Sequence, residues 1–321
     1  MKIKKEYILL LAVIIGLSVY LYVNDRDRIN YELPDIPAIE ESAVDRVEIT
    51  VPDGDSVVLK KKDNTWRMMP EGYPADENKI SSMLKAATDL TLTALVSEST
   101  DYQRYDLSDE DAIMISLFDK DGILLRQFAV GKKAGSTNHT FIRLADNPAV
   151  YHARGSLNST FDKTVSSLRD KTVLAFAKSD VQAIEIKMGA DTIPLEKKTI
   201  PAKTDDAQSE PEDAGKTEWL APDGRQGDVD AINALLDATW SLDCKSYISD
   251  RKEAELGTPI YTLTIKTQKD QTLSLFSPEA EGDGDYPAVS TRAMTPFFLP
   301  KSKATQIIKD PTDLLTDVTE K

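Results

Sequence analysis

Short segments in which apolar and polar residues alternate recur along the chain, and a period of two is typical of strands with one buried face. Two examples in the first half are 47–51 and 112–117, and two in the second half are 184–188 and 260–265. Tight turns such as Lys-Asp-Gly separate several of these segments. Since parallel strands need a long crossover between them, such short connections predict mostly antiparallel sheets.

One amphipathic helix is expected in each half. The helices begin after Asp76 and Asp228, because an aspartate carboxylate can accept the free backbone N–H groups at a helix start. At equal offsets from the two caps, apolar residues form one stripe on each helix. The stripes consist of Ile80, Met83, Leu84 and Leu90 in the first helix and Ile232, Leu235, Leu236 and Leu242 in the second. The pattern predicts helices over 77–92 and 229–242.

The two halves of the chain carry similar elements in the same order. Each half has a strand followed by a tryptophan with a nearby proline, a capped helix, an alternating strand and a hairpin turn, with Trp66 and Trp219 in equivalent places. This shared order favours an internal duplication, and both tryptophans are interpreted as core residues. The predicted fold class is α+β, with an N-terminal transmembrane helix followed by two tandem, duplicated domains. Each domain is expected to hold a mostly antiparallel sheet and one principal helix.

These elements divide the chain into two predicted domains and their connections. One connection is an insertion at about 199–216, which is acidic, contains two prolines and has no apolar period. Such a stretch cannot form a core, so a disordered surface loop is expected there. The predicted segments are a start and anchor at 1–28, a linker at 29–43, a first repeat at 44–155, an interdomain segment at 156–180, a second repeat at 181–300 and a tail at 301–321.

The beginning of the chain has the pattern of a membrane anchor. An uncharged apolar run extends from Tyr7 to Val23, and Lys2, Lys4 and Lys5 precede it. Basic residues before such a run favour a cytoplasmic N-terminus, which predicts a single-pass protein of the bacterial inner membrane with its bulk in the periplasm. The alternative is a cleaved signal peptide, although the run is longer than a usual signal core and lacks a small-x-small cleavage site.

Charge and cysteine content exclude some classes of partner and cross-link. The chain has 54 acidic and 39 basic residues, a formal net charge of −15. An acidic surface argues against nucleic acid or anionic lipid headgroups as the main partner. Cys244 is the only cysteine, so no intrachain disulfide can form.

A search for metal and cofactor motifs finds no complete site. His139 and His152 lie on successive predicted strands, where they could share a face, but a zinc site needs three or four ligands. Both are interpreted as surface or turn residues. The glycine- and lysine-rich segment 131–137 lacks the Walker spacing and the following helix, so it is read as a hairpin loop. No metal site and no cofactor are expected.

A search for catalytic residues also finds no pattern that would identify an active site. The chain has no Gly-x-Ser-x-Gly elbow, and acidic runs such as Asp109–Asp111 are typical of solvated turns. No catalytic residue is assigned, and an enzyme is disfavoured. The alternative is an envelope hydrolase acting on glycan or peptide, in which carboxylates such as Asp109 and Asp111 converge on a cleft.

Several segments together resemble a known bacterial family. The resemblance covers about 44–308 and is carried by Trp66–Pro70, Tyr105–Leu107, Thr140–Arg143 and Leu168–Asp170. It is to an uncharacterised family of membrane-anchored proteins, a domain of unknown function, whose members are often encoded beside gliding-motility-type ABC transporter components. The resemblance implies a non-enzymatic, membrane-anchored periplasmic accessory or binding subunit of an envelope ABC transport system. ABC transporter subunits are the partners that it implies, and it provides no catalytic residues.

Overall fold

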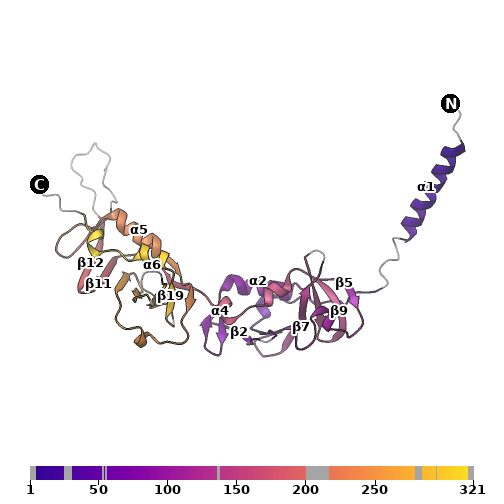
Figure 1. The fold of residues 1–321 in the computed structure, drawn as a ribbon, viewed down its shortest axis with the longest axis horizontal. Helices are drawn as coiled ribbons and strands as arrows, with labels where there is room; N and C mark the ends of the chain where they lie inside the picture. The colour runs from indigo at the N-terminus through magenta and orange to yellow at the C-terminus, as the bar shows by residue number, and fades with distance from the viewer. Residues whose placement is uncertain are drawn as a thin grey trace. The chain divides into compact units, whose positions relative to one another are not determined.

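The computed structural model describes residues 5–24, 31–52, 54, 56–135, 138–199, 217–278, 284–293 and 295–316. The chain divides into two compact units, Met1–Leu168 and Arg169–Lys321 (Figure 1). The expected acidic insertion at 199–216 lies outside the described residues except for Thr199. The other expected domain boundaries stay predictions.

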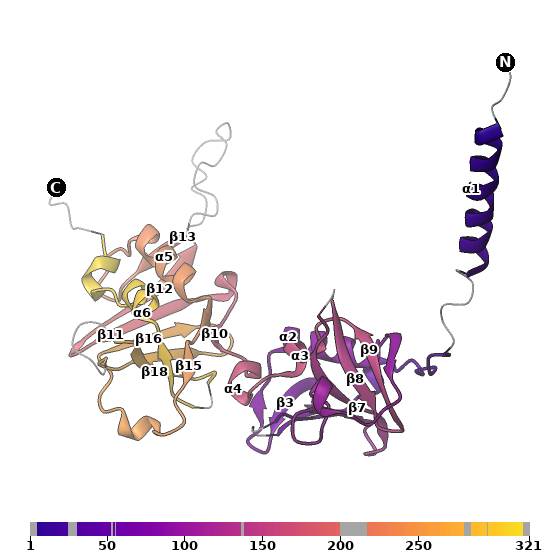
Figure 2. The ribbon, with the colours of Figure 1, turned by 45° about the vertical axis from the view of Figure 1, so that its right-hand side comes forward.

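The first unit is built on one nine-stranded antiparallel sheet. Its strand order is β4-β3-β2-β1-β6-β7-β8-β9-β5, and Figure 2 shows β7, β8 and β9 side by side. The strands are β1 (Arg46–Thr50), β2 (Val57–Lys62), β3 (Thr65–Met69), β4 (Tyr73–Pro74), β5 (Leu92–Ser97), β6 (Ile113–Phe118), β7 (Leu124–Lys133), β8 (His139–Leu144) and β9 (Asn147–Arg154). Its helical elements are α1 (Lys5–Asn24), η2 (Glu41–Ala43), α2 (Glu77–Thr88), η3 (Gln103–Tyr105), α3 (Leu157–Phe161) and α4 (Val165–Leu168).

The second unit has an eight-stranded antiparallel sheet in the order β13-β12-β11-β16-β17-β18-β19-β15, and a two-stranded sheet of β10 and β14. The strands are β10 (Thr172–Ala175), β11 (Ala183–Met188), β12 (Asp191–Thr199), β13 (Thr217–Leu220), β14 (Ser241–Asp243), β15 (Ser246–Tyr247), β16 (Tyr261–Lys266), β17 (Gln271–Leu275), β18 (Tyr286–Ser290) and β19 (Phe297–Leu299). The helical elements are η4 (Lys178–Asp180), α5 (Val229–Thr239), η5 (Glu253–Glu255), α6 (Lys301–Ile307) and η6 (Pro311–Leu314).

The two large sheets have the same strand order. Counted along the chain, β1-β2-β3 and β6-β7-β8-β9 of the first unit correspond to β11-β12-β13 and β16-β17-β18-β19 of the second, and β5 corresponds to β15. The first sheet has one additional edge strand, β4. The two units also share a hydrogen bond at the start of the principal helix. In each unit the backbone N–H of the helix cap donates to the backbone carbonyl of a leucine that lies, in the sequence, after the last strand of the sheet. These bonds are Asp76 N to Leu168 O and Asp228 N to Leu314 O, each 2.8 Å.

The expected α+β class is wrong, because the described part of the chain is mostly β-sheet. It contains nineteen strands, whereas the principal helices α2 and α5 have only 12 and 11 residues. The apolar stripes are buried as expected, but Leu90 and Leu242 lie beyond the ends of the helices. These two leucines fit the helical spacing of apolar residues but are not part of a helix, and Leu242 belongs to strand β14. Trp66 and Trp219 are 6% and 3% exposed, which confirms that they are core residues.

The expected transmembrane helix is also not supported. A helix, α1, does form over Lys5–Asn24. Within the described parts of the chain, however, no helix is long and apolar enough to cross a membrane.

The cap of α2 provides a test of how the first unit is held together. The carboxylate of Asp76 accepts the Lys79 N–H at 3.2 Å and lies 3.0 Å from Lys79 Nζ. Burial alone would raise the pKa of Asp76, but the hydrogen bonds from Lys79 and the charge of this lysine outweigh it. The pKa therefore lies below its ordinary value of 3.8.

Asp76→Ala is expected to lower the free energy of unfolding of the first unit by about 1 kcal/mol at neutral pH. Because the folded pKa is the lower one, this stabilisation is present above a pH of about 4 and is lost as the pH falls through the folded pKa. Urea titrations of the wild type and the variant at about pH 7 and about pH 3 measure it. Glu71→Gln, at an exposed position, serves as the control. An equal difference at both pH values would contradict the assignment of the cap.

Candidate functional site

The outer face of the first sheet, opposite the helix α2, carries a continuous row of rings. Tyr105 contacts Phe141 with ring centroids 4.9 Å apart, Phe141 contacts His152 at 4.9 Å, and His152 contacts His139 at 5.9 Å. All four side chains are half-buried. We call Tyr105, Phe141, His152 and His139 the ring row.

Strand register produces most of this arrangement. Strands β8 and β9 pair antiparallel with Phe141 opposite His152 and His139 opposite Arg154. Side chains directly opposite or diagonal on one face of such a pair are near neighbours, so the histidine rings meet although 13 positions separate them in the sequence. Strands β8 and β9 thus carry three of the four rings, Phe141, His139 and His152.

A glycine allows the segment that carries Tyr105 to approach the sheet. Gly131 lies in β7, and a Cβ built on it would lie 2.1 Å from Tyr105 O and 2.9 Å from the side chain of Leu107. Any larger residue at 131 would therefore push the η3 segment away from β7. Beneath this segment a small cluster of buried residues forms a second core on the outer face. Its members are Leu107, Ala112, Ala129 and Val150.

Arg143 links the ring row to the acidic turn that precedes β6. Its Nη2 lies 2.9 Å from Asp109 Oδ1, and its guanidinium carbon lies 4.6 Å from the centroid of the Tyr102 ring. Burial lowers the pKa of His152, and the neighbouring His139 lowers it further. The lowered pKa favours the neutral form of His152 at pH 7, and the guanidinium groups of Arg143 and Arg104 lie over the rings of Tyr102 and Tyr105.

The corresponding face of the second unit has different chemistry. Following the strand registers, Asp285 and Pro287 occupy the positions of His139 and Phe141, and Phe298 occupies that of His152. The middle of this face consists of hydroxyl side chains on β16 and β17. They pair across the strands as Thr262 with Ser274 at 3.3 Å and Thr264 with Thr272 at 3.5 Å. The ring row is therefore specific to the first unit.

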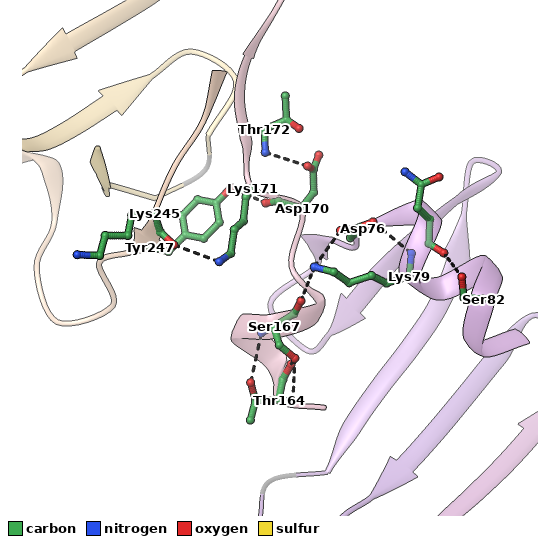
Figure 3. A network of polar contacts seen from close by, with 11 residues as sticks. Asp76, Lys79, Ser82, Thr164, Ser167, Asp170, Lys171, Thr172, Lys245 and Tyr247 are labelled. Carbon is green, nitrogen blue, oxygen red and sulfur yellow. Dashed lines mark hydrogen bonds and ion pairs between the residues drawn. The ribbon is translucent and has the colours of Figure 1, made fainter. Parts of the chain in front are cut away.

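Two groups of polar contacts, one in each unit, stabilise the fold around residues 167–171. In the first unit Lys79 Nζ donates to Ser167 O at 2.8 Å, which ties α2 to α4 (Figure 3). In the second unit the Tyr247 hydroxyl donates to Asp170 O at 2.7 Å (Figure 3). Lys171 Nζ donates to Lys245 O at 3.1 Å. These bonds satisfy backbone carbonyls, which is a structural role.

The carboxylates proposed for a hydrolase each have a polar partner. Asp109 is 91% exposed and paired with Arg143, and Asp111 accepts a hydrogen bond from Ser108 Oγ at 2.5 Å. A pocket of about 200 Å³ in the first unit does hold Glu41 and Glu77. It is smaller than the roughly 300 Å³ at which ligand sites begin, and Glu77 Oε1 accepts the Trp66 N–H at 2.9 Å. A second pocket, of about 420 Å³ between α2 and α3, has Asp76 as its only acidic residue.

The remaining sequence candidates are placed as follows. The two histidines were expected at the surface or in turns, whereas the structure puts both half-buried in paired strands. Segment 131–137 belongs to the hairpin of β7 and β8, apart from residues 136 and 137, which lie outside the described residues. Cys244 is 5% exposed, and burial raises its pKa to about 11, so the thiol is protonated at pH 7. Over the described ranges, no three His, Cys, Asp or Glu residues form a group that could hold a metal.

Sequence reasoning did not identify the ring row. The available signal was the alternation of His139, Phe141 and Arg143 in one strand, which puts all three on one face. Their neighbours Tyr105 and His152 come from other segments, and only the pairing of those segments brings them together.

Comparison with known proteins assigns the chain to one described family. The family model described as "Domain of unknown function (DUF4340)" matches residues 66–259. No curated protein and no solved structure matches the chain.

Proposed function

The chain belongs to the DUF4340 family, and from this premise we propose that it is a non-enzymatic accessory or binding subunit of an envelope ABC transport system. The ring row of the first unit, with Tyr102 and Arg143 beside it, is the proposed protein-binding surface. The two units would lie on the periplasmic side of the bacterial inner membrane, in contact with transporter subunits. The transporter assignment rests on the family resemblance of the sequence.

The single observation that carries the proposal is the composition of the ring row. Aromatic residues and arginine are enriched in the cores of protein interfaces and dominate their binding energy, because they bury large areas at low cost in side-chain entropy. Four half-buried rings in mutual contact, with Arg143 stacked on Tyr102, provide such a set.

The strand beside the ring row is also suited to contact. Strand β5 is an edge of the sheet and pairs with β9, the strand that carries His152. Its six residues, Leu-Thr-Ala-Leu-Val-Ser, contain no charge, and all are half-buried. An interface centred on the ring row would therefore meet no charged residue on this strand.

The difference between the two units supports a role for the first in particular. The sheets share one strand order, but at the positions of Phe141 and His139 the second unit has Pro287 and Asp285, with a ring, Phe298, only at the position of His152. Tyr105 and Phe141 pack against the small outer-face core of the first unit and remain half-buried, and a partner would cover the part of these rings that is still exposed.

Affinity purification of the tagged full-length chain from solubilised envelopes tests this proposal. We expect the wild type to recover ABC transporter subunits, and Phe141→Ser to reduce their recovery by about tenfold, because truncating a central aromatic residue typically costs 1–3 kcal/mol of binding. Val289→Ser, at a half-buried outer-face position of the second unit, is the matched control and should recover as much as the wild type.

Thermal melting shows whether each variant is folded. If the wild type is purified without transporter subunits, the proposed function is wrong. If Phe141→Ser and Val289→Ser reduce recovery equally, the ring row is not the binding surface.

A further inference from the structure

We propose that His139 and His152 form a two-histidine site for a divalent d-block cation, with Cu²⁺ bound more strongly than Zn²⁺. The site is independent of the proposed transport function. It uses the histidine end of the ring row and no residue of the second unit.

The two histidines of the chain lie side by side on the outer face of the first sheet. The chain has only two histidines in 321 residues, and their rings lie next to each other, with centroids 5.9 Å apart and planes inclined by 37°. Neutral imidazole is the side chain that most often binds transition metals in proteins. Because the two residues lie on paired strands, the sheet fixes the separation of their backbones.

The separation of the two rings lies in the range that one cation can join. With a metal–nitrogen bond of about 2.0–2.1 Å, the centroids of two imidazoles on one cation lie about 5.2 Å apart at a tetrahedral angle and about 6.4 Å apart when the two bonds are collinear. The observed 5.9 Å lies between these values. Side-chain rotations that turn one nitrogen of each ring toward the other would complete the site without movement of the strands.

The pair lies next to an aromatic ring and is open to solvent on one side. The ring of Phe141 contacts His152 with centroids 4.9 Å apart. Both histidines are half-buried, so part of each ring faces solvent. No third His, Cys, Asp or Glu completes the site among the residues that the structure describes. A bound cation would thus keep open positions for water, and its affinity would follow the Irving–Williams order, in which Cu²⁺ exceeds Zn²⁺.

The second unit provides an internal comparison. At the positions of His139 and His152 it has Asp285 and Phe298. Asp285 is paired with Lys245 at 2.5 Å, and phenylalanine cannot bind a metal. One site per chain is therefore expected.

Calorimetric titration of the chelator-treated full-length chain with CuCl₂ and with ZnCl₂ tests the proposal. We expect one equivalent of each cation to bind, and His139→Asn or His152→Gln to weaken binding by about tenfold or more, because each substitution removes one of two ligands. The control Asp109→Asn, which alters an exposed carboxylate of an acidic protein, should bind as the wild type does.

A second measurement uses only the wild type. Paramagnetic Cu²⁺ should broaden the backbone NMR signals of β8 and β9 at substoichiometric addition, and leave those of β16 and β17 unchanged. Broadening confined to acidic segments would overturn the proposal. So would unchanged affinity in both histidine variants, or the absence of binding to the wild type.

Discussion

Phe161→Ala is expected to lower the free energy of unfolding of the first unit by about 3–5 kcal/mol, the cost of removing a fully buried aromatic ring. Phe161 lies in α3, beyond the last strand of the sheet, and is 0% exposed. Its ring meets Phe128 of β7 edge to face, with centroids 5.9 Å apart. The substitution would leave a cavity between α3 and the sheet.

Hydrogen exchange measured by mass spectrometry resolves the two units and so tests this prediction. Protection should fall across β6, β7 and β8 and remain unchanged in β16 and β17. Ser159→Ala, at an exposed position of the same helix, is the control, and such surface changes usually stay within about 0.5 kcal/mol. An equal loss of protection in both units would show that residues 157–161 do not belong to the core of the first unit alone.

Arg126→Leu is the other substitution with a large expected effect, a loss of about 2–4 kcal/mol in the first unit. The side chain is 9% exposed, and its Nη1 donates to Ala87 O at 2.7 Å and Thr88 O at 2.8 Å, at the end of α2. Its Nη2 donates to Pro37 O, in the segment before β1. Leucine would leave the buried carbonyls of Ala87 and Thr88 without this donor, and each unsatisfied group costs about 1–3 kcal/mol.

The second unit suggests a partial rescue of this change. Gln271 lies opposite Ile265 of β16, and Arg126 lies opposite the corresponding residue of β6, Leu117. Gln271 therefore occupies the position of Arg126. Its Nε2 donates to Ala175 O at 2.5 Å, and its Oε1 accepts the Ala175 N–H at 3.2 Å. We therefore expect Arg126→Gln to lose less stability than Arg126→Leu in urea titrations. Lys60→Met, at an exposed position of β2, controls for the loss of a positive charge, and equal stability of all three variants would contradict this role of Arg126.

Strands and helix starts could be predicted from the sequence because they depend on local spacing. The segment 47–51 alternates and forms β1 to within one residue, and Asp76 and Asp228 cap α2 and α5 as expected. The balance of helix and sheet was not predictable in the same way. Leu90 and Leu242 continue the helical spacing, yet the chain leaves the helix before them.

The features that matter for function depend on contacts between distant segments. Arg126 has the sequence signature of a solvent-facing strand residue, but its partner Pro37 is 89 positions away. The ring row likewise requires the register of β8 with β9 and the close approach that Gly131 permits. Neither the register nor the glycine contact has a local signal in the sequence.

Site-specific photo-cross-linking in intact cells tests the central claim, that the ring row of the first unit binds a transporter subunit. A photoreactive amino acid would replace Phe141, and in a matched strain it would replace Val289 on the outer face of the second unit. We expect a cross-link to an ABC transporter subunit from position 141 and none from position 289. Cross-links to such a subunit from 289 but not 141, or from neither position in cells that contain the transporter, would contradict the account.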